Sequence, residues 1–160
     1  MAVLAILVTG ALWYRGRSAA RSEIGPPHGS DAAASRPAGC DGQAPPPLPE
    51  HLTPAGTSIE AIVDALDKTL ADDHKRALRC FADEDDLLAH AQGGFGAWLR
   101  TTLHLWSRND TTKAFAAIGL TNADAMSEVL MRVYFHRLRG QALAIDQTVG
   151  KVRAAAKAAR

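Results

Sequence analysis

Three glycines in four residues lie one helical turn before an arginine, and this segment is the clearest candidate for ligand chemistry. Gly93-Gly94-Phe95-Gly96 interrupts a helical pattern, and Arg100 follows. A glycine-rich turn that leads into a helix presents backbone amides at the positive end of the helix dipole, where anions bind. A nearby guanidinium adds a bidentate fork for carboxylate or phosphate. Gly94, Gly96 and Arg100 are therefore candidate ligand-binding residues.

The same residues also have a structural interpretation, which we favour. Small residues let a helix pack closely, and Arg100 would pair with the carboxylate of Asp124 or Glu84. The segment lacks the Lys-Ser/Thr pair of a nucleotide-binding P-loop. If Arg100 is structural, Arg100→Ala should lower the stability of the fold, because a carboxylate would remain unpaired. If Arg100 binds a ligand, the same substitution should leave stability unchanged and abolish binding.

The other reactive side chains do not form a catalytic or metal site. Ser127 and His136 are nine residues apart and point to opposite sides of a helix. We interpret Cys80 as a small buried apolar residue rather than a thiol paired with His90. No histidine pair has metal-binding spacing with an acid, and residues 83–86 lack the central glycine of a calcium loop. We expect no catalytic residue, no metal and no cofactor, and an enzyme is not favoured.

Apolar residues recur with helical period along the second half of the chain, and no run alternates as a strand would. We therefore predict an all-α fold, a small bundle of about five to six short helices, preceded by an N-terminal apolar helix and a disordered linker. The glycine-rich segment is expected to interrupt the helical structure, because its glycines adopt positive φ angles or because its backbone closely approaches a neighbouring element. The expected helices include about 73–82 and 97–106, and others begin near residues 57, 83, 110 and 122, with a helix-prone tail.

Capping residues mark the expected helix ends. Thr57 begins a capping box for the first helix, and Asp110 and Asn122 are the expected caps of two later ones. Gly119 and Gly140 are expected to end the helices that precede them.

Composition divides the chain into four parts. Residues 1–21 form a membrane anchor or signal-like segment, in which thirteen uncharged residues, 2–14, precede three arginines. Residues 22–56 are rich in Pro, Ala, Gly and Ser, which predicts a disordered linker. Residues 57–140 form the helical domain, and 141–160 form a basic, Ala-rich tail.

The side of the membrane stays open. Arginines after the apolar run favour a cytoplasmic domain. A start site assigned too late would instead make this an ordinary anchor or signal peptide and export the domain. The net charge of +1 gives no reason to expect nucleic acid as a partner.

One pattern of residues resembles a known family. Gly94-Phe95-Gly96-Ala97-Trp98-Leu99-Arg100, then Leu105-Trp106, then Asp124-Ala125-Met126-Ser127 resembles an uncharacterised bacterial domain of unknown function, over about residues 58–140. Members often carry a histidine and an acidic stretch before the glycines, where this chain has Glu84, Asp86 and His90. Thr101 stands where the family usually has Asn. The resemblance implies no activity, and the framework residues that it suggests are Trp98, Arg100, Leu105, Trp106, Asp124 and Ser127.

Large aromatic residues favour protein interaction over catalysis. Phe135 falls off the main apolar stripe of its helix. An exposed Phe135 beside Trp106 would be a binding hot spot, whereas a second packing face would bury it. We expect an uncharacterised membrane-tethered or exported helical protein, a non-enzymatic interaction module with an unknown protein partner. The alternative is a small-molecule or anion-binding domain centred on residues 94–96 and Arg100.

Overall fold

The computed structural model describes residues 46–158, and every regular element in that range is helical, which confirms the all-α prediction. The N-terminal apolar segment and most of the predicted linker lie outside the described residues. No helix in 46–158 combines the length and apolar character needed to span a bilayer. In chain order the elements are α1 (Ile59–Thr69), α2 (Asp72–Arg79), α3 (Glu84–Ala91), a π-helical turn (Gln92–Gly96), α4 (Ala97–Thr102), α5 (Asp110–Ala117), α6 (Ala123–Leu138) and α7 (Ile145–Ala158).

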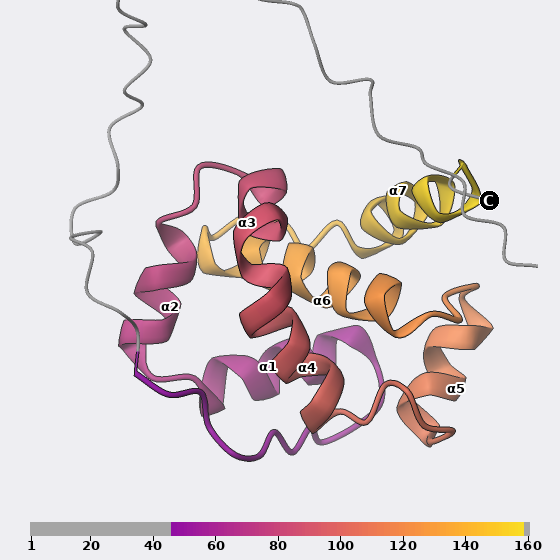
Figure 1. The fold of residues 1–160 in the computed structure, drawn as a ribbon, viewed down its shortest axis with the longest axis horizontal. Helices are drawn as coiled ribbons and strands as arrows, with labels where there is room; N and C mark the ends of the chain where they lie inside the picture. The colour runs from indigo at the N-terminus through magenta and orange to yellow at the C-terminus, as the bar shows by residue number, and fades with distance from the viewer. Residues whose placement is uncertain (1–45, 159–160) are drawn as a thin grey trace, which may run out of the picture. The chain divides into compact units, whose positions relative to one another are not determined.

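Helix α6 is the centre of the bundle (Figure 1). Helices α1, α2, α3, α4 and α7 all pack against it, and every residue from Val129 to Phe135 is buried. A helix covered on all sides needs no polar face. Phe135 is 3% exposed, so a second packing face of α6 explains its position. The alternative, that Phe135 is an exposed binding hot spot beside Trp106, is wrong.

Side-chain caps fix where the helices begin. Ser58, rather than Thr57, caps α1, and Asn109, rather than Asp110, caps α5 through a capping box. In both cases the cap is the extended residue immediately before the first helical turn, as the geometry of capping requires. Asn122 caps α6 as predicted.

Two glycines end helices as predicted. Gly119 follows α5 with φ +81°, and Gly140 follows α6 with φ +66°. These left-handed conformations favour glycine because it has no Cβ.

The glycine-rich segment does not break the chain. Residues 92–96 form a π-helical turn that joins α3 to α4 without a loop, and none of its glycines has a positive φ. The predicted break is therefore wrong, because a π turn takes one extra residue and keeps the helix running. Close approach does occur at Gly96, where a Cβ would lie 3.0 Å from Sδ of Met131 on α6.

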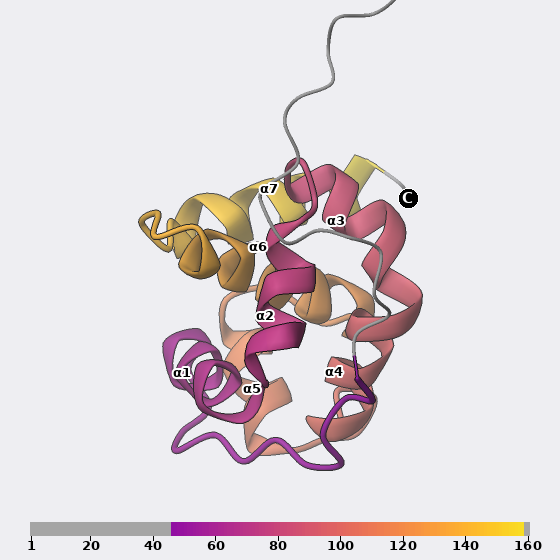
Figure 2. The ribbon, with the colours of Figure 1, turned by 90° about the vertical axis from the view of Figure 1, so that its left-hand side faces the viewer.

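Two segments flanking the family-like region complete the folded body. The strap, which we define as residues 46–52, runs along one edge of the bundle near α1 and α4 (Figure 2). Leu52 is buried at its end. Helix α7 packs on α6 through Val149 and Val152. The body thus begins before the range predicted for the domain and continues into the range predicted as a tail.

Candidate functional site

Arg100 on α4 points toward α6 and is largely buried, with a side-chain exposure of 11%. Its Nη1 donates to Oγ of Ser127 (3.0 Å) and lies 3.3 Å from Oδ1 of Asp124. Its Nη2 donates to the carbonyl oxygen of Gln92 (3.4 Å). The guanidinium also lies 5.8 Å from the ring centroid of Trp106, within cation–π range. One side chain therefore connects the π-helical turn, α4 and the start of α6.

The structure brings the sequence-predicted residues around Arg100 together in this seam. Ser127 is buried and donates its hydroxyl to the carbonyl oxygen of Asp124 (2.9 Å), so its oxygen serves the first turn of α6. Gly94 and Gly96 belong to the π-helical turn, so α4 follows a helical turn rather than an open loop. The seam has the character of packed framework, in which both terminal nitrogens of the Arg100 guanidinium have partners while its Nε has none.

Trp98 lies apart from this seam and faces the strap. Its indole Nε1 donates to the carbonyl oxygen of Pro49 (2.6 Å), and its ring stacks on Phe95 with centroids 5.7 Å apart. A buried indole N–H needs an acceptor, and the strap supplies it. Trp98 therefore positions the chain that leads into α1.

The turn between α4 and α5 displays Trp106 on the surface. Trp106 is 67% exposed, whereas Leu103 and Leu105, which precede it, are buried. Asn109 donates through Nδ2 to the carbonyl oxygens of Leu103 (3.1 Å) and His104 (3.0 Å), while its Oδ1 caps α5. The two buried leucines and the bridging amide of Asn109 leave this turn little freedom.

The turn also holds a strained residue. His104 has φ +50°, a left-handed conformation that is uncommon outside glycine. Thr112 donates its hydroxyl to the carbonyl oxygen of Ser107 (2.9 Å) and so closes the other side of the turn. Strain of this kind persists only where the surrounding contacts fix it.

A second polar cluster, which was not predicted from the sequence, joins α3, α6 and α7. Glu84 accepts hydrogen bonds from Arg132 and His136, and Nζ of Lys151 lies 3.5 Å from its Oε2. Arg132 also donates to Glu128 (2.9 Å). Arg132 is buried, with a side-chain exposure of 7%, and Glu84 has 22%. The cluster buries charge but holds it in pairs, as buried charge requires.

The surroundings set the protonation state of Glu84. Desolvation raises the pKa of the Glu84 carboxyl, but hydrogen bonds from Arg132 and His136, with the charges of Arg132 and Lys151, outweigh it and hold the pKa below its usual value. Glu84 is therefore ionised at neutral pH. An ionised carboxylate with its lone pairs occupied suits a structural pair better than a general base.

The signal for this cluster was present in the sequence. Arg132 stands within an apolar run of α6, and a charged residue in such a position needs a buried partner. The identity of that partner could not be predicted, because nothing local relates Arg132 to Glu84, 48 residues earlier.

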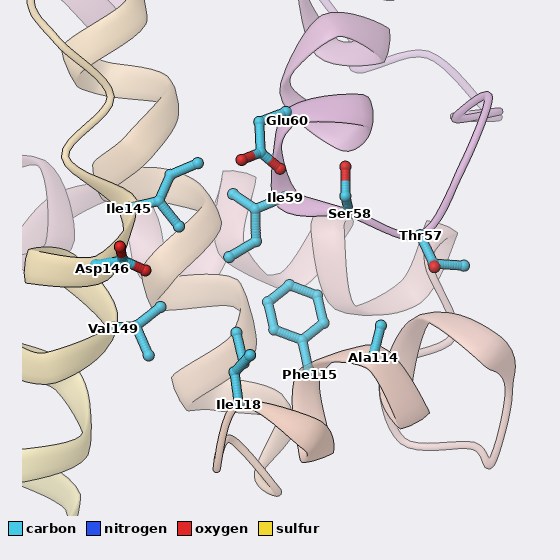
Figure 3. Close-up of a pocket in the computed structure, with 10 residues that line it drawn as sticks. All are labelled: Thr57, Ser58, Ile59, Glu60, Ala114, Phe115, Ile118, Ile145, Asp146 and Val149. Atoms are coloured by element: carbon cyan, nitrogen blue, oxygen red, sulfur yellow. The ribbon is translucent and has the colours of Figure 1, made fainter.

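A pocket of about 320 Å³ opens between α1, α5 and α7 (Figure 3). Its walls are mainly apolar, from Ile59, Phe115, Ile118 and Val149, and Glu60 and Asp146 add carboxylates. None of the sequence-predicted site residues lines it. Its lining has no histidine, cysteine or basic side chain that would serve as base, nucleophile or anion ligand.

The remaining predicted side chains lie apart from the Arg100 seam. His90 pairs with Asp86 (3.0 Å) on the surface of α3 and stacks on Phe81. Cys80 ends α2 and is half-buried and disulfide-bonded, so the interpretation as a buried apolar residue is wrong. Within residues 46–158, no group of three or more His, Cys, Asp or Glu side chains has the arrangement of a metal site.

Comparison with known proteins gives a family and no function. No curated protein and no solved structure matches the chain. Residues 57–138, just over half of the chain, match a family described as a domain of unknown function. The matched range holds both the Arg100 seam and the Glu84 cluster except for Lys151. The chain therefore belongs to the family described as Domain of unknown function (DUF6794).

Proposed function

We propose that this protein is a non-enzymatic interaction module, tethered to or exported across a bacterial membrane by its N-terminal segment, and that Trp106 is the centre of its contact surface. The observation that carries the proposal is the 67% exposure of Trp106 on a turn held by Asn109. Tryptophan often dominates the energy of protein interfaces. A preformed turn loses little freedom on binding, which raises affinity.

The side chains around Trp106 suggest the chemistry of the partner. His104 and Arg108 are exposed on the same turn, and Arg100 beneath the ring is balanced by Asp124. An apolar centre with a polar, basic rim fits a protein surface that offers an apolar pocket with acidic residues beside it. The proposed contact therefore needs no reactive group on this chain.

The alternative, an anion or small-molecule site at residues 94–96 and Arg100, has one supporting observation. Nε of Arg100 is buried without a hydrogen-bond partner. An anion would, however, compete with Asp124 and Ser127 for Nη1, because both already contact that nitrogen. Losing these contacts would unpair the buried hydroxyl of Ser127, so this site is the weaker proposal.

The tether rests on the sequence of the first 21 residues. An uncharged run of thirteen residues followed by Arg15, Arg17 and Arg21 is typical of a membrane-targeting segment. Membrane attachment would concentrate the module near a membrane-bound partner and so raise the effective concentration of one for the other.

The proposal is tested by crosslinking from the Trp106 turn. A photo-crosslinking phenylalanine derivative placed at Ser107, which is exposed beside Trp106, should capture one protein from membranes that contain the full chain. Binding of the purified partner is then measured with Trp106→Ala. We expect an affinity about 30-fold weaker or more, as for a hot-spot residue.

Ile118→Ala is the matched control. Ile118 is the other large apolar side chain exposed in residues 46–158, at 39%, and its loss should change the affinity less than about threefold, since it lies outside the proposed contact. Both variants should keep the wild-type melting temperature. Equal binding by wild type and Trp106→Ala, or capture from position 118 but not 107, would exclude Trp106 as the contact.

A further inference from the structure

The strap is held by the ring N–H groups of two side chains from two different helices. Nε2 of His74 on α2 donates to the carbonyl oxygen of Pro46 (2.7 Å), and Nε1 of Trp98 on α4 donates to the carbonyl oxygen of Pro49 (2.6 Å). His74 is 5% exposed, so its N–H has little access to water and the strap carbonyl satisfies it. Both donors bind main-chain oxygens, so neither hydrogen bond depends on a side chain of the strap.

The two acceptors have the spacing of one turn of a polyproline II helix. Residues 46–49, Pro-Pro-Leu-Pro, belong to no α-helix or strand. Their sequence favours polyproline II, because proline fixes its own φ and keeps the residue before it extended. This helix has three residues per turn and no internal hydrogen bonds, so carbonyls three residues apart face the same side and are free to accept. One side of the strap therefore meets both ring N–H groups.

The strap seat, which we define as His74, Phe95 and Trp98, also offers aromatic surface. The Trp98 ring stacks on Phe95 with centroids 5.7 Å apart. Leu48 of the strap packs against the apolar core, whereas Pro46 and Pro47 are exposed. Aromatic side chains that contact an extended proline-rich segment are the general means by which protein modules bind proline-rich peptides.

The strap is joined to the bundle so that it can leave without unfolding a helix. Residues 53–58, between Leu52 and α1, are mostly exposed and form no α-helix or strand. Among the described residues, no backbone–backbone hydrogen bond involves residues 46–57. Apart from the two ring N–H groups, the strap is anchored mainly by the buried side chain of Leu52 and the partly buried side chain of Leu48. Few contacts of this kind correspond to a low cost of local opening.

We propose that the strap seat is a binding site for a proline-rich segment of another protein, and that residues 46–52 occupy it as an intramolecular ligand. The segment that fits has two prolines three residues apart, in polyproline II conformation, with an apolar residue between them. A tethered ligand has an effective concentration of the order of 1 mM, so the strap limits binding to tight or abundant partners. The inference does not depend on Trp106, so each proposal can fail alone.

The first test measures binding of a fluorescein-labelled peptide with the sequence of residues 46–52 to the purified full chain. Leu52→Asp removes the main anchor of the strap and leaves the three residues of the strap seat unchanged. We expect this variant to bind the peptide at least about tenfold more tightly than wild type, because the intramolecular competitor is weakened. Equal affinity for the two proteins, or binding to neither, would overturn the proposal.

Two variants remove one ring N–H each and keep an aromatic ring. Trp98→Phe and His74→Phe, each combined with Leu52→Asp, should weaken peptide binding about five- to tenfold through the loss of one hydrogen bond. His74→Phe leaves no new polar atom unpaired, because Nδ1 of His74 is already buried without a partner. Ile118→Ala in the same background is the control, since Ile118 lies outside the strap seat, and it should leave the affinity unchanged.

A change of spacing in the peptide tests the polyproline register. One alanine inserted between the positions of Pro47 and Leu48 turns the Pro46 carbonyl away from the side that carries the Pro49 carbonyl. This peptide should bind about five- to tenfold more weakly to Leu52→Asp but should lose nothing further with His74→Phe, because the same hydrogen bond is already absent. Full additivity of the two changes would show that the register is not recognised.

Wild type provides a test that does not depend on the folding of a variant. At about 1 mM unlabelled peptide, hydrogen exchange at the amides of residues 50–52 should become faster, because the peptide displaces the strap. Unchanged exchange would overturn the proposal. Sedimentation equilibrium should show a monomer, and a dimer that Leu52→Asp dissociates would mean that a second copy of the chain, rather than another protein, occupies the seat.

Discussion

Two buried arginines show how far single residues could be read from the sequence. Arg100 pairs with Asp124, one of the two carboxylates expected for it. This pair could be predicted because both residues belong to the same sequence motif. Glu84, the other carboxylate, pairs with Arg132 instead. Nothing local indicates that pairing, because it depends on how α3 crosses α6. Sequence patterns thus indicate that a buried charge needs a partner, but tertiary packing selects it.

Glu84 also makes stability depend on pH. Its pKa is lower in the folded protein than the usual value of 4.5, so the folded state favours the ionised form. The resulting stabilisation is present above about pH 4.5 and is lost as the pH falls through the lower folded value. Glu84→Gln should lower the free energy of unfolding by about 1–3 kcal/mol at pH 7. The difference from wild type should shrink as the pH falls below about 4.5 in urea titrations.

Asp110→Asn is the control for this prediction. The pKa of Asp110 is also lowered, by a hydrogen bond from Lys113 and by the positive charge of Lys113, but the carboxylate is fully exposed. Exposed pairs of this kind contribute little to stability, so its unfolding midpoint should hardly change. An equal pH response in both variants would mean that the Glu84 cluster is not the source.

At the scale of elements, helices with regular apolar periods were predictable and the junction between α3 and α4 was not. Helix α6 was visible from its apolar spacing, its Asn122 cap and its terminal Gly140. The glycine-rich segment carries the strongest local signal for a break. Packing against α6 overrides that signal, since Phe95 and Gly96 are buried within a helical turn. The anion-site hypothesis had assumed an open loop at this point.

The glycines of this turn should respond oppositely to substitution. A Cβ at Gly94 meets nothing within 4 Å, whereas a Cβ at Gly96 lies 3.0 Å from Sδ of the fully buried Met131. Gly94→Ala should raise the free energy of unfolding by about 0.5 kcal/mol, because it restricts the unfolded chain at a helical position. Gly96→Ala should lower it by about 1 kcal/mol or more through overpacking.

Chemical denaturation of both glycine variants checks this prediction. Gly93→Ala, whose Cβ also meets nothing within 4 Å, should behave like Gly94→Ala. A loss of stability at all three positions would indicate that the π-helical turn depends on backbone freedom rather than on close packing at Gly96.

At the scale of the whole molecule, the folded body is larger than the range that matches the family. The match covers residues 57–138, yet the strap and α7 both bury apolar side chains on that range. Their contribution was hard to predict, because a Pro-rich composition indicates a linker and an Ala-rich one a solvated tail. The decisive residues are few, with Leu52 in the strap and Val149 and Val152 in α7.

A fragment restricted to residues 57–140 should therefore be much less stable than residues 46–160. It exposes the surfaces that Leu52, Val149 and Val152 cover, each worth about 1.5–3 kcal/mol when fully buried. We expect the free energy of unfolding to fall by several kcal/mol in urea titrations under reducing conditions. Fragments 46–140 and 57–160 should show intermediate losses, and equal stability of all four fragments would contradict this account.

The π-helical turn also sets the rotational phase of the helices that it joins. Leu87 on α3 and Leu99 on α4 are both almost completely buried, and both helices pack on α6. Twelve α-helical steps would leave these two side chains about 120° apart around the axis, whereas eleven leave them about 20° apart. By absorbing one residue, the turn lets both leucines face the same neighbour. Residue number in this segment is therefore constrained even where residue identity is not, and a homologue that gains or loses one position here must realign an entire helix.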